Sequence, residues 1–140
     1  MEFEKPLPLQ TPAATPFWKG LQDETVRLQQ CDGCSHWVFY PRNHCPRCLE
    51  SSLTWRDVSG EATLYSFTIA RQPTAPHFAD EVPQLLAIVE LKEGVRMTST
   101  LIHVEPEELR VGLPLEPYFD HVSNEVTLLR FTNNSDKTCE

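Results

Sequence analysis

The sequence predicts a mainly β protein in which a short N-terminal helix and a cysteine-rich ribbon precede a five-stranded barrel. Three observations support this prediction. Four of the five cysteines lie between residues 31 and 48, strand-like segments alternate with turn signals after residue 53, and a Thr-Pro pair followed by apolar residues precedes the first cysteine. The 140 residues suit one domain or two small modules. We expect an arm and helix at 1–25, the ribbon at 26–52, the barrel at 53–131 and a flexible tail at 132–140.

Composition and charge narrow the classes of partner. Hydrophobic residues make up 40% of the chain and charged residues 23%, as in ordinary folded proteins. The net charge is −8, and after residue 70 six basic residues stand against twelve acidic ones. Such a surface repels phosphate backbones and anionic lipids, so we expect neither a nucleic-acid nor a membrane partner. The chain shows no spanning apolar run and no signal-peptide pattern, which predicts a cytoplasmic protein.

Residues 1–25 are expected to form an extended, Pro-rich arm and a short helix. The repeated prolines fix φ and remove backbone donors, which favours an extended arm. Thr15 is the candidate N-cap and Pro16 the first helical residue of a helix that ends near Glu24. The apolar stripe of this helix consists of Phe17, Trp18 and Leu21. Its aromatic rings either pack on the second half of this chain or dock on another subunit.

Residues 53–131 carry the strand signals. The expected strands are 53–58, 61–70, 84–91, 95–102, 115–119 and 125–131. Ser59-Gly60 and Lys92-Glu93-Gly94 are turn signals, since glycine supplies the positive φ that short turns require. A helical turn is expected at 106–110. Five short strands that close on themselves hide most of their edges, which favours an OB-fold barrel. In the strand 61–70, the residues expected on one face are Thr63, Tyr65, Phe67 and Ile69.

Two C-x-x-C pairs separated by ten residues are the strongest functional signal. The candidate metal ligands are Cys31, Cys34, Cys45 and Cys48. Each tight turn directs two sulfurs at one point, with Gly33 where the first turn is expected to need glycine, and four thiolates complete a tetrahedral zinc site. Because that site has no open position, the zinc is expected to be structural. The alternatives are disulfides, iron in a rubredoxin-like site, and a histidine ligand from His36 or His44.

Catalytic motifs are missing from the sequence. It contains no phosphate-binding glycine loop, no G-x-S-x-G elbow and no H-E-x-x-H. His103 and His121 stand alone in the sequence, and the three glutamates between 105 and 108 are expected to form a solvated turn. The segment 71–83 is longer than a hairpin needs, and is either a binding loop or a mobile surface loop. Its candidate contact residues are His77 and Phe78.

Together these features resemble the family catalogued as domain of unknown function 35 (DUF35), a rubredoxin-like zinc ribbon fused to an OB-fold. The resemblance covers about residues 15–120. It rests on the Pro-Phe-Trp helix, the C-x-x-C-x₁₀-C-x-x-C spacing, Trp55, and the sequence Val58-Ser59-Gly60 that leads into the barrel. The segments 91–96 and 109–112 look like the family's barrel hairpin and its later turn. Glu61-Ala62 departs from the family pattern, which often has a second glycine there.

The resemblance implies an accessory role. Members of the family assemble with thiolase-fold or related acyl-transfer and aldolase proteins, and the catalytic residues belong to those partners. The chain is therefore expected to be a non-catalytic, zinc-binding subunit. It would bridge and organise a hetero-oligomeric acyltransferase complex that contains a thiolase-like subunit. Such a complex also allows contact between this chain and the acyl donor or the substrate. One branch of the family acts in a bacterial complex that acetylates phloroglucinol-type phenols, and overall likeness favours that branch. The four zinc ligands are the site residues that carry over, and no catalytic residue does.

Two other functions compete with this interpretation. A stand-alone acyl-CoA-binding protein would need a positive cluster for the CoA phosphates, and the sequence shows none. A single-stranded nucleic-acid-binding OB module would use Tyr65, Phe67 and Phe119 as stacking surfaces, but the acidic charge opposes it. The candidate contacts with a partner or ligand are Phe17, Trp18, His77 and Phe78.

Overall fold

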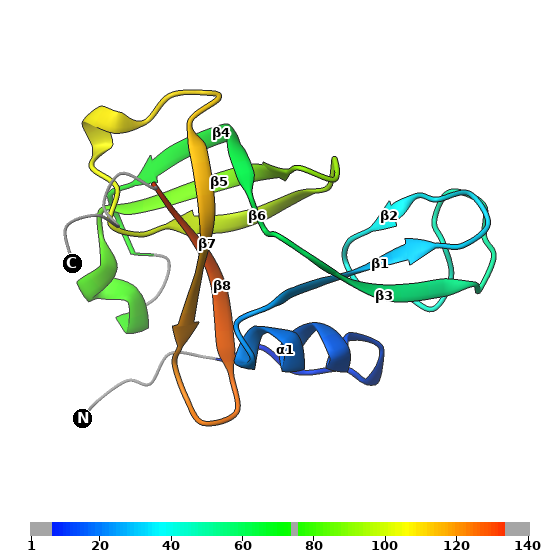
Figure 1. The fold of residues 1–140 in the computed structure, drawn as a ribbon. Helices are drawn as coiled ribbons and strands as arrows, with labels where there is room; N and C mark the ends of the chain where they lie inside the picture. The colour runs from blue at the N-terminus through cyan, green and yellow to red at the C-terminus, as the bar shows by residue number, and fades with distance from the viewer. Residues whose placement is uncertain (1–6, 74–75, 134–140) are drawn as a thin grey trace.

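The computed structural model describes residues 7–73 and 76–133, except for the side chains of residues 77, 78 and 81. A small three-stranded sheet extends away from a closed barrel, and a short helix lies beside both (Figure 1). The elements, in chain order, are the 3-10 turn η1 (Pro12–Ala14), α1 (Thr15–Gln22), β1 (Val26–Cys31), β2 (Trp37–Val38), β3 (Leu53–Val58), β4 (Ala62–Ala70), η2 (Pro76–Glu81), β5 (Gln84–Leu91), β6 (Arg96–Leu101), η3 (Pro106–Glu108), β7 (Pro114–His121) and β8 (Thr127–Asn133). The expected class, a short helix and ribbon followed by a five-stranded barrel, is confirmed. In the described ranges, no helix is long and apolar enough to span a membrane.

The ribbon sheet has the order β2-β1-β3, with antiparallel pairing throughout. Strand β3 pairs with β1 over its whole length, from Cys31 opposite Leu53 to Val26 opposite Val58. The expected barrel range of 53–131 thus begins with a strand that belongs to the ribbon sheet. The sequence pattern identifies this strand but does not specify its partner, because pairing depends on register with a distant segment.

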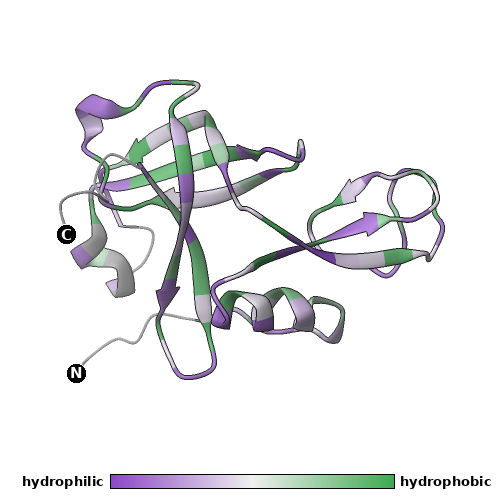
Figure 2. Ribbon diagram, viewed as in Figure 1, coloured by the Kyte–Doolittle hydropathy of each residue, from purple (hydrophilic) through white to green (hydrophobic). Residues whose placement is uncertain are grey.

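The barrel consists of β4-β5-β6-β8-β7. Its neighbours pair antiparallel except β6 and β8, which are parallel and pair at Leu101 and Phe131. Along the barrel strands hydrophobic and hydrophilic residues alternate (Figure 2), and the inward set forms the core. Val26 and Leu28 of β1 join this core cluster, so the base of the ribbon sheet packs against the barrel.

A β-bulge in β4 changes which face its aromatic residues occupy. The pairing register with β5 shifts between Leu64 and Ser66, and a bulge inserts one unpaired residue. After it, Phe67 pairs with the buried Ala87 and so shares its side of the sheet, although the Phe67 ring remains 37% exposed. Tyr65 lies on the other side under the guanidinium of Arg96, 3.9 Å from its ring centre. The expectation that Thr63, Tyr65, Phe67 and Ile69 share one face is therefore wrong. Tyr65 and Phe67 do not form one stacking platform.

Helix α1 begins one residue earlier than expected. Thr15 is inside the helix and Ala14 is the N-cap, so the expected capping role of Thr15 is wrong; its hydroxyl donates to Thr11 O at 3.2 Å. The turn η1 leads directly into α1 and takes the place of a side-chain cap. Leu21 is fully buried and Phe17 nearly so, which places the apolar stripe of α1 against this chain.

The turn predictions agree with the backbone. Gly60 and Gly94 both adopt positive φ, at 81° and 94°, and η3 occupies the expected helical turn. At the C-terminal end, β8 continues to Asn133, two residues into the expected tail. The remainder of that tail, 134–140, lies outside the described residues.

Candidate metal centre and the adjoining groove

The four predicted ligands converge at the outer end of the ribbon. Cys31 ends β1 and the other three thiols lie in the two loops that follow, with all four Sγ atoms within 4.8 Å of one another. Cys31 and Cys48 are 3.5 Å apart at Sγ, and Cys34 and Cys45 are 3.7 Å apart. Four sulfurs about 2.3 Å from one zinc ion are separated by about 3.8 Å in a tetrahedron. The thiols therefore fit zinc, and they are far beyond the roughly 2.05 Å of a disulfide.

The two cysteine loops repeat one backbone pattern. The amide of Ser35 donates to Cys31 O at 2.9 Å, and the amide of Leu49 donates to Cys45 O at 2.8 Å. Both donors have positive φ, 65° at Ser35 and 68° at Leu49. The left-handed positions are thus the residues after the second cysteine of each pair. Gly33, which we expected to need this freedom, does not have positive φ, and a methyl group there would meet Glu50 Oε1 at 2.8 Å, the end of an exposed side chain that is free to move.

Hydrogen bonds and burial give the clustered thiols different pKa values. Burial opposes ionisation of Cys45, but the backbone amides of Cys48 and Arg47 donate to its sulfur and bring its pKa down to about 7. The amide of Glu50 lowers the pKa of Cys48, yet the neighbouring thiols and burial prevail and raise it to about 12. Adjacent sulfurs cannot all hold negative charge without a cation. A zinc ion supplies that charge, and four thiolates leave no open position for a reacting water.

The histidines whose side chains the structure describes do not join this centre. His36 and His44 are not among the clustered metal-binding groups. His121 Nε2 lies 2.9 Å from Glu24 Oε2, and its Nδ1 lies 2.8 Å from Thr127 Oγ1. An ionised carboxylate only accepts, so the proton lies on Nε2. This chain of hydrogen bonds looks like a base with a hydroxyl nucleophile, but Thr127 is 1% exposed and out of reach of a substrate. It joins the end of α1 to the β7-β8 hairpin.

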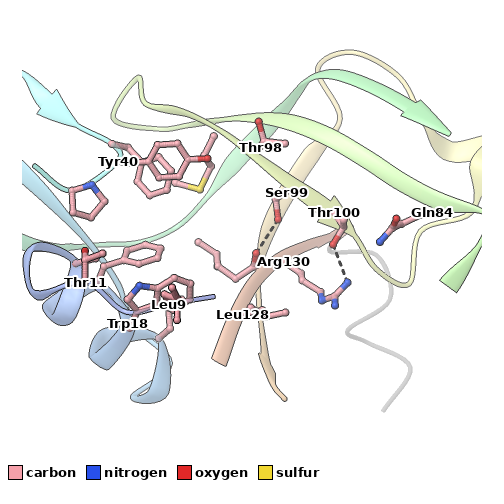
Figure 3. A pocket seen from close by; sticks show the side chains of 17 residues that line it. Leu9, Thr11, Trp18, Tyr40, Gln84, Thr98, Ser99, Thr100, Leu128 and Arg130 are labelled. Atoms are coloured by element: carbon pink, nitrogen blue, oxygen red, sulfur yellow. Dashed lines mark hydrogen bonds between the residues drawn. The ribbon is translucent and has the colours of Figure 1, made fainter. Parts of the chain in front are cut away.

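A groove of about 500 Å³ lies between α1, the segment 39–41, β6 and β8 (Figure 3). We call it the helix–barrel groove. Its walls include Trp18, Phe39, Tyr40, Met97, Leu128 and Arg130. Of the predicted contact residues, Phe17 and Trp18 both line it. Phe17 is buried, with its ring 5.3 Å from that of Trp18 and 5.6 Å from that of Phe39. The predicted contacts His77 and Phe78 have side chains outside the described part of the structure.

Gln29 holds one wall of this groove in place. Its side-chain amide donates to Arg42 O and accepts from Arg42 N, both at 2.8 Å, and it is 5% exposed. This pair of bonds fixes the chain just after Phe39 and Tyr40 against β1. Sequence reasoning missed Gln29 and Arg130, because their roles depend on contacts between distant segments. The one signal in the sequence is that Gln29 occupies a position in a strand where burial would be expected.

A closed four-cysteine ribbon followed by a five-stranded OB barrel defines a zinc-ribbon and OB-fold protein. Comparison with family models gives the same two parts. Residues 18–54 match "ChsH2, rubredoxin-like zinc ribbon domain", and residues 55–120 match "ChsH2, C-terminal OB-fold domain". The chain belongs to the DUF35 family.

Several curated relatives are similar over most of this chain. A DUF35 domain-containing scaffold protein of Methanothermobacter thermautotrophicus is 33% identical over 97 residues, which cover 69% of this chain and 72% of that protein. The Pyrococcus furiosus protein of the same description is 35% identical, covering 71% and 73%. A probable enoyl-CoA hydratase alpha subunit of Thermomonospora curvata is 31% identical over 80% of this chain, which spans only 35% of that longer protein.

Two solved structures share the fold. The structure titled "Ltp2-ChsH2(DUF35) aldolase" contains a chain with a TM-score of 0.81 and 25% identity, and the match covers 91% of this chain and 99% of that one. A DUF35 protein of unknown function from Sulfolobus solfataricus has a TM-score of 0.63 at 17% identity, with coverage of 89% and 87%. The second likeness is one of fold alone.

Proposed function

We propose that this chain is a non-catalytic, zinc-stabilised scaffold subunit that assembles with a thiolase-like catalytic subunit in a complex that transfers acyl groups or forms carbon-carbon bonds. The observation that carries the proposal is the closed four-thiol centre in a chain similar in structure to the ChsH2 (DUF35) component of an aldolase. The archaeal relatives described as scaffold proteins support it as well. Acetylation of a phloroglucinol-type phenol is the particular reaction that we propose for such a complex.

The absence of a reactive centre among the described residues supports a partner that performs the chemistry. In the ranges 7–73 and 76–133, the four thiols are the one group of three or more His, Cys, Asp or Glu side chains close enough to share a metal ion. A zinc ion there would hold the two loops together and would have no position for substrate. The hydroxyl of Thr127, which has a histidine in contact, is buried.

We propose that the partner contacts the chain at Trp18 and at the loop that carries His77 and Phe78. Trp18 is half-buried at the edge of the groove, and the nearby Tyr40 is 61% exposed. Exposed aromatic rings of this kind are enriched at protein interfaces because they bury much apolar area and keep a polar group for hydrogen bonding. We further propose the cytoplasm as the compartment, since a reducing environment keeps zinc-binding thiols free.

Reconstitution with the native partner tests this proposal. The tagged chain is used to capture partners from native lysate, the co-purifying subunits are identified by mass spectrometry, and acyl transfer or aldol activity is assayed with and without this chain. We expect a thiolase-like subunit to co-purify and its activity to fall when the chain is omitted. Acyl transfer by the purified chain alone at the rate of the complex would refute the non-catalytic role.

A matched pair of variants connects the zinc to the scaffold role. Cys45→Ser removes one metal ligand, whereas Cys139→Ser removes the one cysteine outside the C-x-x-C pairs. We expect Cys45→Ser to lose bound zinc and to capture less partner, and Cys139→Ser to behave as the parent chain. Equal capture by a zinc-free Cys45→Ser protein would show that assembly does not need the ribbon.

A further inference from the structure

The helix–barrel groove lies along β6 and β8, next to α1. The paired position of these parallel strands is Leu101 with Phe131. Ser99 Oγ also donates to Leu129 O at 2.8 Å, so the two strands are linked at the groove. The resulting space of about 500 Å³ falls within the range of about 300–1,000 Å³ that small-molecule sites occupy.

The two ends of the groove differ in chemistry. One end lies between the rings of Trp18, Tyr40 and their aromatic neighbours, and the guanidinium of Arg130 lies at the other (Figure 3). Leu128 covers the wall between them. An apolar body with one polar end would match this layout.

The one charged group on the groove wall is a cation. Among the residues that the structure describes, no acidic side chain lines the groove, and Arg130 is the one charged side chain that does. Arg130 Nε lies 2.8 Å from Asp120 Oδ2, but Asp120 lines the neighbouring hollow and does not enter this one. Asp120 thus forms an ion pair with the guanidinium, and a bound carboxylate would share the guanidinium with Asp120.

Donors are available at the polar end. Arg130 Nη1 donates to Thr100 Oγ1 at 2.9 Å, which orients the guanidinium and leaves the hydroxyl proton of Thr100 to be donated. The Arg130 side chain is 17% exposed, so a hydrogen bond to it is less screened by water than one at an open surface. A guanidinium with an adjacent hydroxyl is well suited to a carboxylate.

We propose that the helix–barrel groove binds an amphipathic monocarboxylate, with its carboxylate at Arg130 and Thr100 and its hydrocarbon body along Leu128 toward Trp18. This site is distinct from the zinc centre, and it is a property of the chain alone. It shares Trp18 with the partner contact proposed above, so it is tested on the chain without a partner.

Calorimetric titration of the zinc-loaded full-length chain tests the proposal. The probes are decanoate, decanol and decyltrimethylammonium, all kept below the concentrations at which they form micelles, and quenching of tryptophan fluorescence is the second readout. We expect one decanoate per chain, bound at least about tenfold more tightly than decanol, since a charge-assisted hydrogen bond is worth about that factor or more. The cationic probe should bind most weakly.

Three variants locate the site. Arg130→Gln should reduce decanoate affinity about tenfold and leave decanol binding unchanged, whereas Trp18→Ala should weaken both probes alike. Arg96→Gln is the matched control, because that arginine pairs with Glu90 and does not line the groove. Circular dichroism and thermal melting confirm that each variant is folded. Equal affinity for decanoate and decanol, an unchanged decanoate affinity in folded Arg130→Gln, or no binding would overturn the proposal.

Discussion

Gly60 lies where the ribbon sheet ends and the barrel begins, and replacing it by alanine measures how closely the two parts are joined. Its φ of 81° falls in the left-handed region, which costs a residue with a Cβ about 1–2 kcal/mol. An added methyl group would also lie 2.7 Å from Pro117 Cγ and 3.0 Å from Val26 Cγ2. Overpacking of this kind costs about 1–3 kcal/mol. Gly60→Ala should therefore lower the free energy of unfolding by about 2–5 kcal/mol.

Gly94 and Gly112 separate these two contributions. They have φ of 94° and 93°, similar to that of Gly60, but an added methyl group would meet nothing within 4 Å at either position. Gly94→Ala and Gly112→Ala should each cost only the backbone part, about 1–2 kcal/mol. Urea unfolding of the zinc-loaded proteins, followed by circular dichroism, gives all three values. If Gly60→Ala costs no more than the two controls, close packing of Pro117 and Val26 around Gly60 does not contribute to stability.

Three further substitutions test other parts of the structure. Cys45→Ser should release zinc and unfold the ribbon while the barrel remains folded, as seen by metal analysis and by NMR spectra compared with those of Cys139→Ser; a native ribbon spectrum without metal would contradict the zinc assignment. Gln29→Leu leaves the backbone N–H and C=O of Arg42 without their partners. It should lower the free energy of unfolding in urea by about 1–3 kcal/mol. No change would show that water replaces the Gln29 side-chain amide. Leu21→Ala removes a fully buried side chain of α1 and should cost about 2–5 kcal/mol; a loss below about 1 kcal/mol would mean that α1 is not stably docked.

Local patterns in the sequence account for much of the fold and for the metal centre. The C-x-x-C pairs bring two sulfurs together within a few residues of chain, so their spacing alone indicates the site. The glycine of the Lys92-Glu93-Gly94 turn acts in the same local way, since its positive φ is a property of one residue. Such features need no knowledge of distant segments.

The features that the sequence did not disclose depend on register. Strand 53–58 was identifiable as a strand, but its place beside β1 rests on pairing across more than twenty residues. The bulge in β4 puts Phe67 on the same side of the sheet as Ala87, although strict alternation places it with Tyr65. The helix–barrel groove combines residues from five separate segments, and Arg130 becomes its one charged group among the described residues only after the barrel has closed.

The ladder between β1 and β3 also sets a distance. It begins at Val26 and Val58, beside the barrel, and ends at Cys31 and Leu53, beside the metal centre (Figure 1). Each residue of an antiparallel strand adds about 3.4 Å, so two extra residues in both strands would move the metal centre outward by about 7 Å with its orientation retained. One extra residue in each would turn it to the opposite side. The number of paired residues thus sets how far the metal centre stands from the barrel.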